Sequence, residues 1–231
     1  MAYCRIPWTK LEKRIISCTK CPRLIKYISR VSEEKVRRYK DWSYWGHPLP
    51  GFGDVDARLV IIGLAPAAHG GNRTGRLFTG DSSGDWLIKA LYNEGFSNQI
   101  ESISRDDGLN LFSTFLTAAI RCAPPGNKPT SQELENCSEY LLEELQLLNK
   151  VRVVLVLGRI AFNTYLKYVY PKSEKPKPRF KHGNIYSLPG KPMLVVSYHP
   201  SRQNTQTGRL TWEMWINIFN KVKQILEYTE S

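Results

Sequence analysis

Four cysteines have spacings that could place thiolates around a metal. Cys18 and Cys21 form a CxxC pair, in which a tight turn lets two thiolates meet one metal. Cys122 and Cys137 lie far along the chain, at the end of an expected strand and inside an expected helix. Four thiolates suit zinc or an iron–sulfur cluster, which spacing does not separate, and buried free cysteines are the plain alternative. The remaining cysteine, Cys4, is expected to be a free thiol.

A glycine-rich loop over residues 64–84 follows the first expected strand. Small side chains there let a ligand approach the backbone, whose N–H groups can meet an anion. The loop matches neither a GxGxxG fingerprint nor a Walker motif. Phe78 could stack on a flat ring and Asp81 could polarise a water, or Phe78 could be a core residue and Asp81 a helix cap. The small candidate ligand-binding residues are Gly63, Ala65, Ala67 and Ala68.

Two further polar side chains follow other expected strands. Asn127 lies in a proline-stiffened loop, and its amide offers the paired donor and acceptor that can read a base edge. A turn role is an equal alternative for this asparagine. His199 precedes Pro200 at the end of the last expected strand, where it could donate a hydrogen bond to a developing anion. A structural histidine is the usual alternative.

The charge balance indicates a polyanionic partner. The chain has 33 Lys and Arg against 21 Asp and Glu, a net charge of +12. Attraction to phosphates follows from that excess and weakens as salt rises, although a basic protein without an acidic partner is an alternative. No apolar run is long enough to cross a membrane, and the N-terminal residues lack the apolar core of a secretory signal. We therefore expect no membrane partner and a cytoplasmic location.

To bring these residues together, the fold must place the carboxyl ends of several strands at the same edge of a sheet. Strand patterns alternate with helix patterns, which favours a parallel sheet covered on both faces, with ligands bound beyond the carboxyl ends of the strands. We expect one domain over residues 1–231, an α/β fold: a three-layer α/β/α sandwich with a central four-stranded parallel sheet and an N-terminal helical extension. Thr130 and Glu133 form a capping-box pattern, and residues 171–179 are expected to be an exposed loop. Strands are expected at 57–63, 114–120, 151–157 and 193–197, and helices at 8–39 with a break near Pro22, 85–92, 130–149, 158–168 and 210–228.

Taken together, four ordered segments resemble the family 5 uracil-DNA glycosylases, the iron–sulfur branch of the uracil-DNA glycosylase superfamily. The similarity runs from Cys18 to about Leu226. A related branch with a Gly-Glu-Ala-Pro-Gly first motif is less similar, because Leu64 stands where that branch has an acid. The matching segments are GLAPA at 63–67, GGNRTGRLFTGD at 70–81, RCAPP at 121–125 and HPS at 199–201, followed by Asn204 and Thr207.

The resemblance implies a monofunctional glycosylase that flips uracil, and also hypoxanthine and other deaminated bases, out of DNA. It would hydrolyse the N-glycosidic bond and leave an abasic site, which starts base excision repair. By position, His199 would donate to the base O2, Phe78 would stack on the base and Asn127 would read its edge. Asp81 is then the candidate for positioning water. The four paired cysteines would hold a structural [4Fe–4S] cluster that fixes the N-terminal helices.

The resemblance also implies contacts with damaged DNA, double-stranded and in some cases single-stranded, by a monomer. Residues 202–209 would enter the minor groove and fill the gap left by the flipped base, with Ser201 and Thr207 near phosphates. The expected DNA-binding set is completed by Asn204 and by the backbone-tracking residues Arg73, Arg76, Lys128, Arg202 and Arg209.

Two other classes of protein compete with this interpretation. A zinc-stabilised nucleic-acid-binding module would explain the charge and the cysteines, but it would leave the glycine-rich loop and His199 without a role. A metal-dependent nuclease or phosphatase needs several carboxylates at strand ends, and only Asp81 is well placed. The glycosylase therefore accounts for more of the motifs than either alternative.

Overall fold

A sheet built on four parallel strands positions every loop of interest. The computed structural model describes residues 5–170 and 178–228, and its strands run in the order β1-β3-β2-β4-β6-β5. The inner strands are almost wholly apolar, as expected for a parallel sheet buried on both faces. They are β2 (Leu59–Gly63), β3 (Thr114–Ala118), β4 (Val153–Leu157) and β6 (Met193–Ser197).

The predicted four-stranded parallel sheet is confirmed, and two short antiparallel strands extend it. These are β1 (Phe52–Gly53) at the β3 edge and β5 (Ile185–Tyr186) at the β6 edge. Each has only two residues, too few for an alternating pattern to be visible in the sequence.

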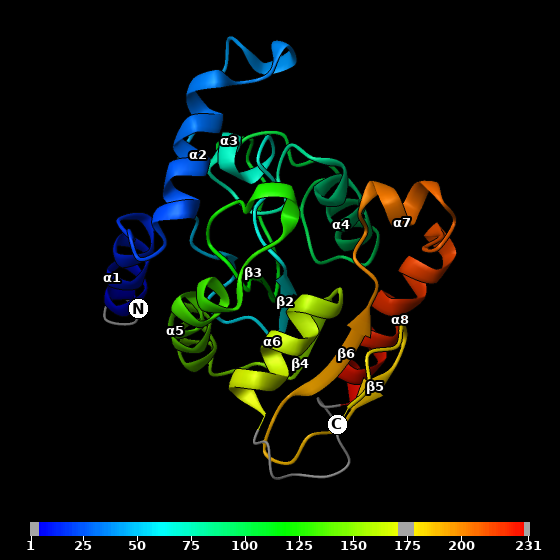
Figure 1. The fold of residues 1–231 in the computed structure, drawn as a ribbon. Coiled ribbons are helices and arrows are strands. Elements are labelled where there is room, and N and C mark those ends of the chain that lie inside the picture. The colour runs from blue at the N-terminus through cyan, green and yellow to red at the C-terminus, as the bar shows by residue number, and fades with distance from the viewer. Residues whose placement is uncertain (1–4, 171–177, 229–231) are drawn as a thin grey trace.

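Helices cover both faces of the sheet, which confirms the three-layer arrangement (Figure 1). On one face, Leu59 and Ile61 pack in a cluster with residues of α4 and α8, and on the other, Val60 and Ile62 pack with residues of α5 and α6. Alternate residues of β2 therefore serve opposite layers. These helices are α4 (Ser82–Asn93), α5 (Ser131–Leu147), α6 (Arg159–Val169) and α8 (Trp212–Tyr228).

The N-terminal helical extension lies beside α5 and the glycine-rich loop (Figure 1). Helix α1 (Arg5–Ile16) contacts α5, and α2 (Pro22–Glu34) contacts the short helix α3 (Gly71–Thr74). Residues 35–46, which we call the arm, follow α2 and include the 3-10 helix η1 (Arg37–Tyr39).

The structure differs from the sequence expectations mainly inside loops. Helix α4 begins at Ser82 rather than Asp85, because Asp81 caps it. The loop segments also contain three short helices that were not expected, α3, η2 (Pro125–Asn127) and α7 (Arg202–Gln206). The predicted capping box of Thr130 and Glu133 is present. Cys4 and most of the expected loop at 171–179 lie outside the described residues. No helix in the described segments is long and apolar enough to span a bilayer.

A buried ion pair joins the end of β3 to α5. Arg121 and Glu144 are each 1% exposed, with Arg121 Nη2 2.8 Å from Glu144 Oε2. Thr117 Oγ1 donates to the same carboxylate, and Glu144 Oε1 accepts a bond from the backbone N–H of Gly51. The carboxylate therefore holds together β3, α5 and the segment before β1.

We expect Glu144→Gln to destabilise the fold by about 3–5 kcal/mol, because it leaves the Arg121 guanidinium buried without its countercharge. Glu143→Gln is the matched control on the same helix, since Glu143 forms an exposed pair with Arg14. That control should cost about 1 kcal/mol or less. Urea unfolding of both variants measures the difference, and equal losses would contradict the assigned role of the buried pair.

Candidate active site

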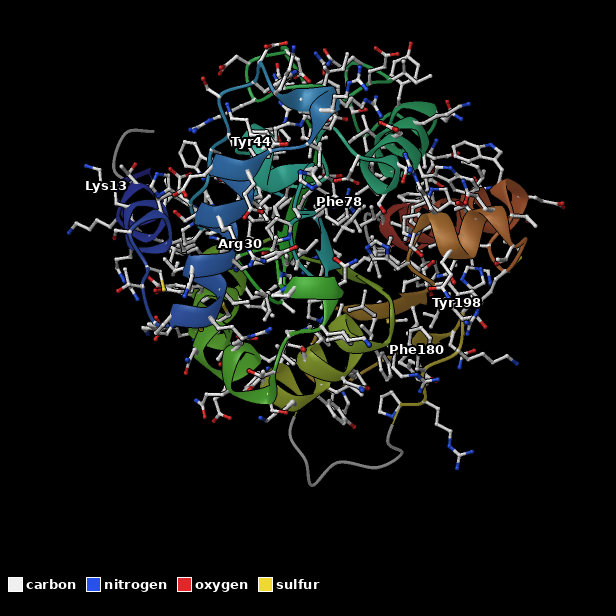
Figure 2. The ribbon with its side chains drawn as sticks, turned by 45° about the horizontal axis from the view of Figure 1, so that its top comes forward. Lys13, Arg30, Tyr44, Phe78, Phe180 and Tyr198 are labelled. Carbon is white, nitrogen blue, oxygen red and sulfur yellow. The ribbon has the colours of Figure 1, made fainter. Side chains whose placement is uncertain are left out.

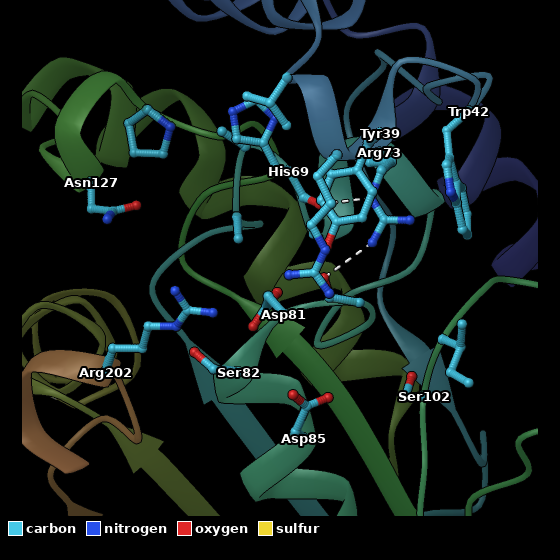
Figure 3. A pocket seen from close by; sticks show the side chains of 18 of the residues that line it. Tyr39, Trp42, His69, Arg73, Asp81, Ser82, Asp85, Ser102, Asn127 and Arg202 are labelled. Carbon is cyan, nitrogen blue, oxygen red and sulfur yellow. Dashed lines mark hydrogen bonds between the residues drawn. The ribbon is translucent and has the colours of Figure 1, made fainter. Parts of the chain in front are cut away.

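A cavity of about 820 Å³ opens at the carboxyl ends of the strands, as the parallel sheet predicts. Its walls come from α2 and the arm, from the loop after β2, from the loop after β3 and from α7. Figure 3 shows Asp81 near the middle of this cavity, with Asn127 and Arg202 on one side and Arg73 and Trp42 on the other. Predicted residues from separate parts of the sequence therefore share one cavity.

Asp81 caps α4 and also lines the cavity, so the cap is confirmed and its role in positioning water stays a prediction. Its Oδ1 accepts hydrogen bonds from the backbone N–H groups of Ser83 and Gly84, each at 3.0 Å. Its Oδ2 lies against Gly70, where any Cβ atom would collide with the carboxylate. Burial raises the pKa of Asp81, and the two capping N–H groups oppose that rise. The cap thus fixes the carboxylate in place while one oxygen faces the glycine-rich loop.

Asn127 is exposed on the opposite side of the cavity from the arm (Figure 3). Its φ of 57° lies in the left-handed region, which asparagine tolerates better than most residues. The turn interpretation is therefore correct for its backbone. Its side chain borders the cavity as well, so the base-reading role stays a prediction.

His199 lines a second, smaller cavity of about 330 Å³ with Leu64 and Asn204. Adjacent segments supply both cavities: the loop after β2 and the residues of α7 contribute to each. His199 is half-buried as a residue, and burial of its ring among protein atoms lowers its pKa to about 4. The imidazole is therefore neutral near pH 7 and retains one N–H that can donate.

Aromatic rings surround the mouth of the smaller cavity. Phe180 and Tyr198 both line it, and their ring centres are 6.0 Å apart (Figure 2). The guanidinium of Arg209 lies 4.8 Å from the centre of the Tyr198 ring, and that of Arg159 lies 4.8 Å from the centre of the Phe180 ring. An exposed arginine therefore covers each ring at this mouth.

Phe78 occupies a strained position beneath the first motif. Its φ of 51° is unusual for a bulky residue, and its ring lies so close to Gly63 that a Cβ there would collide with it. The ring also packs against two core clusters. Phe78 is not among the described residues that line either cavity, so the core interpretation is correct and stacking on a base stays a prediction.

Two of the expected phosphate-contacting arginines are buried, which corrects the prediction for them. Arg76 is 4% exposed, and its Nη2 lies 2.7 Å from Asp107 Oδ2. Arg73 is 3% exposed and binds backbone carbonyls of its own loop. Neither guanidinium can track DNA phosphates at the surface, because folding of the glycine-rich loop encloses both.

The remaining expected DNA contacts lie on or near α7. Arg202 and Arg209 are exposed, and Arg202 also lines the larger cavity. Ser201 caps α7 by accepting a bond from the Asn204 N–H, and Asn204 Nδ2 donates to the His199 carbonyl at 2.8 Å. Thr207 Oγ1 donates to the Gln203 carbonyl, and Lys128 is exposed beside Asn127. Contact of these residues with DNA stays a prediction.

The predicted metal-ligand cysteines converge between α2, α5 and the loop after β3. Cys21, Cys122 and Cys137 are buried in one cluster, and all four are free thiols. Burial raises the pKa of Cys137 to about 11 and raises that of Cys21 and of Cys122. Within the described ranges, no group of three or more His, Cys, Asp or Glu side chains lies close enough to hold a metal ion.

The arm contributes cavity residues that the sequence did not single out. Tyr39 and Trp42 line the larger cavity, and Tyr44 Oη lies 3.1 Å from His69 Nδ1 in the glycine-rich loop. The only sequence signal was the mixture of basic and aromatic residues near position 40. That mixture is typical of a nucleic-acid surface as well as of a loop clasp, so it could not locate a site.

Comparison with known proteins identifies a family. A family model described as the uracil DNA glycosylase superfamily matches residues 50–223. A type-5 uracil-DNA glycosylase of Thermus thermophilus is 49% identical over 212 residues, which cover 91% of this chain and 94% of that protein. A type-5 uracil-DNA glycosylase of Pyrobaculum aerophilum is 46% identical and covers 90% of this chain and 88% of its own. A type-4 uracil-DNA glycosylase of the same organism is 28% identical over 196 residues, which cover 83% of this chain and 82% of that protein.

We expect the His199 imidazole to stay neutral at pH values well below about 6.5, the ordinary pKa of histidine. Its pKa is lowered in the folded protein, so this histidine opposes folding once protonated, and stability falls as pH drops from about 6.5 towards about 4. Side-chain ¹H–¹⁵N spectra recorded across this range measure the titration, and His199→Gln identifies the resonance. A titration midpoint near 6.5 in the folded protein would contradict the claim that burial lowers the pKa of His199.

Proposed function

The chain belongs to the uracil-DNA glycosylase superfamily, and we infer that it is a monofunctional glycosylase that removes uracil from DNA by hydrolysing the N-glycosidic bond. The reaction leaves an abasic site and so begins base excision repair. One structural observation carries the assignment: the half-buried Asp81, with its carboxylate held by the α4 cap, lies in a large cavity at the carboxyl ends of the parallel strands.

Removing a base from duplex DNA requires that the nucleotide leave the stack. Unstacking costs a few kcal/mol, least for a mispaired base, so the lesion itself lowers the barrier. The net charge of +12 attracts the phosphate backbone, and the exposed Arg202 and Arg209 lie beside the two cavities. We propose that α7 and the residues after it contact the strand from which the base is flipped.

Bond cleavage places positive charge on the sugar and negative charge on the departing base. In our proposal, Asp81 faces the sugar, where its carboxylate stabilises the positive charge and orients the attacking water. The neutral His199 ring lines the adjacent smaller cavity, and in our proposal the flipped nucleotide extends into that cavity, where the ring donates its N–H to the base oxygen that becomes negative. Leu64 and Ala65 in the first motif have no polar group that could share either task, so Asp81 is the main candidate.

The size of the larger cavity supports a broad base preference. A volume of about 820 Å³ exceeds what one pyrimidine needs, so the cavity has room for a bulkier purine. Asn127 on its exposed edge offers a donor and an acceptor rather than a closely fitted recognition pocket. We therefore propose hypoxanthine and other deaminated bases as further substrates, chiefly in double-stranded DNA, and a cytoplasmic monomer as the working form.

We propose that Cys18, Cys21, Cys122 and Cys137 hold a [4Fe–4S] cluster. Three of these thiols, those of Cys21, Cys122 and Cys137, are buried together in one group of core side chains. Their pKa values are raised, so thiolates at these positions need a compensating cation. A single zinc ion would draw all four sulfurs to about 2.3 Å from one point, whereas a four-iron cluster gives each thiolate its own iron and accepts wider spacing. The cluster would tie α2 and α5 together.

Incubation with duplexes that carry U·G, hypoxanthine·T or undamaged pairs, followed by alkali, tests the activity. We expect strand breaks at uracil and a loss of about 100-fold or more in Asp81→Asn, because asparagine still caps α4 but carries no charge. Asp106→Asn is the control, since Asp106 is an exposed carboxylate that does not line the cavity. Binding without base release in the native protein would instead support the non-catalytic binding module.

Iron analysis of the anaerobically purified protein tests the cluster. We expect a brown protein with about four irons per chain, and loss of both colour and iron in Cys137→Ser. Cys4→Ser is the control and should keep the iron, because Cys4 is not in the proposed ligand set. A colourless protein with one tightly held zinc ion would overturn the assignment.

A further inference from the structure

Arg73 differs from the two other buried arginines of the described chain. Arg76 pairs with Asp107 and Arg121 pairs with Glu144, so carboxylates neutralise both charges. In the part of the chain that the structure describes, Arg73 has no carboxylate within ion-pair distance, although it is only 3% exposed. A buried charge without a countercharge lowers stability, which raises the question of what this one does.

The guanidinium of Arg73 joins two separate points within the glycine-rich loop. Its Nε donates to the His69 carbonyl at 2.8 Å, and its Nη2 donates to the Gly80 carbonyl at 3.1 Å (Figure 3). These carbonyls directly precede Gly70 and Asp81, the residues whose Cα and carboxylate lie against each other. The third nitrogen, Nη1, is buried without a partner among the described residues. Arg73 therefore sets the spacing on which the position of the carboxylate depends.

The arm holds the same guanidinium from its other side. The Cζ atom of Arg73 lies 3.9 Å from the centre of the Tyr39 ring and 4.1 Å from the centre of the Trp42 ring. The backbone N–H of Trp45 also donates to the Arg73 carbonyl at 3.0 Å. These contacts reduce the freedom of a long side chain and partly offset the loss of its hydration.

The charge of Arg73 has a small effect on Asp81. Burial raises the pKa of Asp81 most, the capping N–H groups of Gly84 and Ser83 lower it, Asp85 raises it, and Arg73 lowers it least. The other titratable or charged groups that line the cavity around Asp81 come from each surrounding element. They are His69 in the loop, Tyr27 on α2, Arg38 and Tyr39 on the arm, and Arg202 on α7.

We propose that Arg73 is the positioning residue for Asp81: clasped by the arm, it anchors the Gly80–Asp81 segment, and its positive charge favours the ionised carboxylate. This inference rests on the proposed function of Asp81 in base removal.

Single-turnover uracil release across pH tests the role. We expect Arg73→Met to lower the rate about tenfold or more near neutral pH, because the carboxylate is no longer held in place, and to move the acid limb of the profile to higher pH. Arg73→Lys, which keeps the charge, should return the limb towards its native position. Arg105→Met is the matched control: Arg105 stacks on Trp45 of the arm but is exposed and does not line the cavity, so its profile should not change.

A readout independent of catalysis separates this inference from the proposed function. The ¹³C titration of the Asp81 carboxyl, assigned with Asp81→Asn, should have a higher midpoint in Arg73→Met than in the native protein even if neither releases uracil. An unchanged midpoint in a folded Arg73→Met overturns the proposal. If that variant does not fold, Trp42→Leu removes one side of the clasp, and an unchanged Asp81 midpoint there overturns it equally. Affinity for undamaged duplex should stay native in Arg73→Met, because the guanidinium is enclosed.

Discussion

The buried Arg121–Glu144 ion pair is the constraint on which the active region depends. It fixes Arg121, three residues beyond β3, against α5; Cys122 follows Arg121 directly, and Cys137 lies two helical turns before Glu144 on α5. The loop that continues from Cys122 leads to Asn127 at the cavity edge. A charge pair that is satisfied by Thr117 and by a backbone N–H has one favourable arrangement, since any displacement leaves a buried charge unpaired. It therefore sets the geometry of both the cysteine cluster and the cavity.

The glycine-rich loop uses buried arginines in a similar way but with two different outcomes. Arg76 is neutralised by Asp107 and thus fixes the second half of the loop to residues 102–107. Arg73 binds carbonyls instead, so its positive charge remains available to Asp81. The two arginines are three positions apart, and the sequence predicts a phosphate contact for each. The folding of the loop instead pairs Arg76 with a carboxylate and leaves Arg73 bound to carbonyls beside the cavity.

The N-terminal extension links the cysteine cluster with the active region. Cys21 precedes α2, and the residues after that helix clasp the turn around Arg73. Hydrogen bonds from Asn72 to the Ile28 carbonyl and from Gly46 to the Asn72 carbonyl join α2 and the arm to the same turn. Helix α2 therefore connects the buried cysteines at its start to the turn around Arg73 at its end.

The sequence by itself determined the class of fold, the order of the central strands along the chain, the capping box at Thr130 and the motifs that indicate a glycosylase. These features depend on local patterns, because apolar runs, caps and short motifs involve neighbouring residues. Which polar residues meet depends on the packing of the layers. Packing places Asp81 and Asn127 in one cavity and His199 in another, encloses Arg73 and Arg76, and brings Tyr39 and Trp42 of the arm against the glycine-rich loop. Such contacts join residues far apart in the chain. Burial determines their protonation state and their access to the surface, and it exists only once the layers have packed.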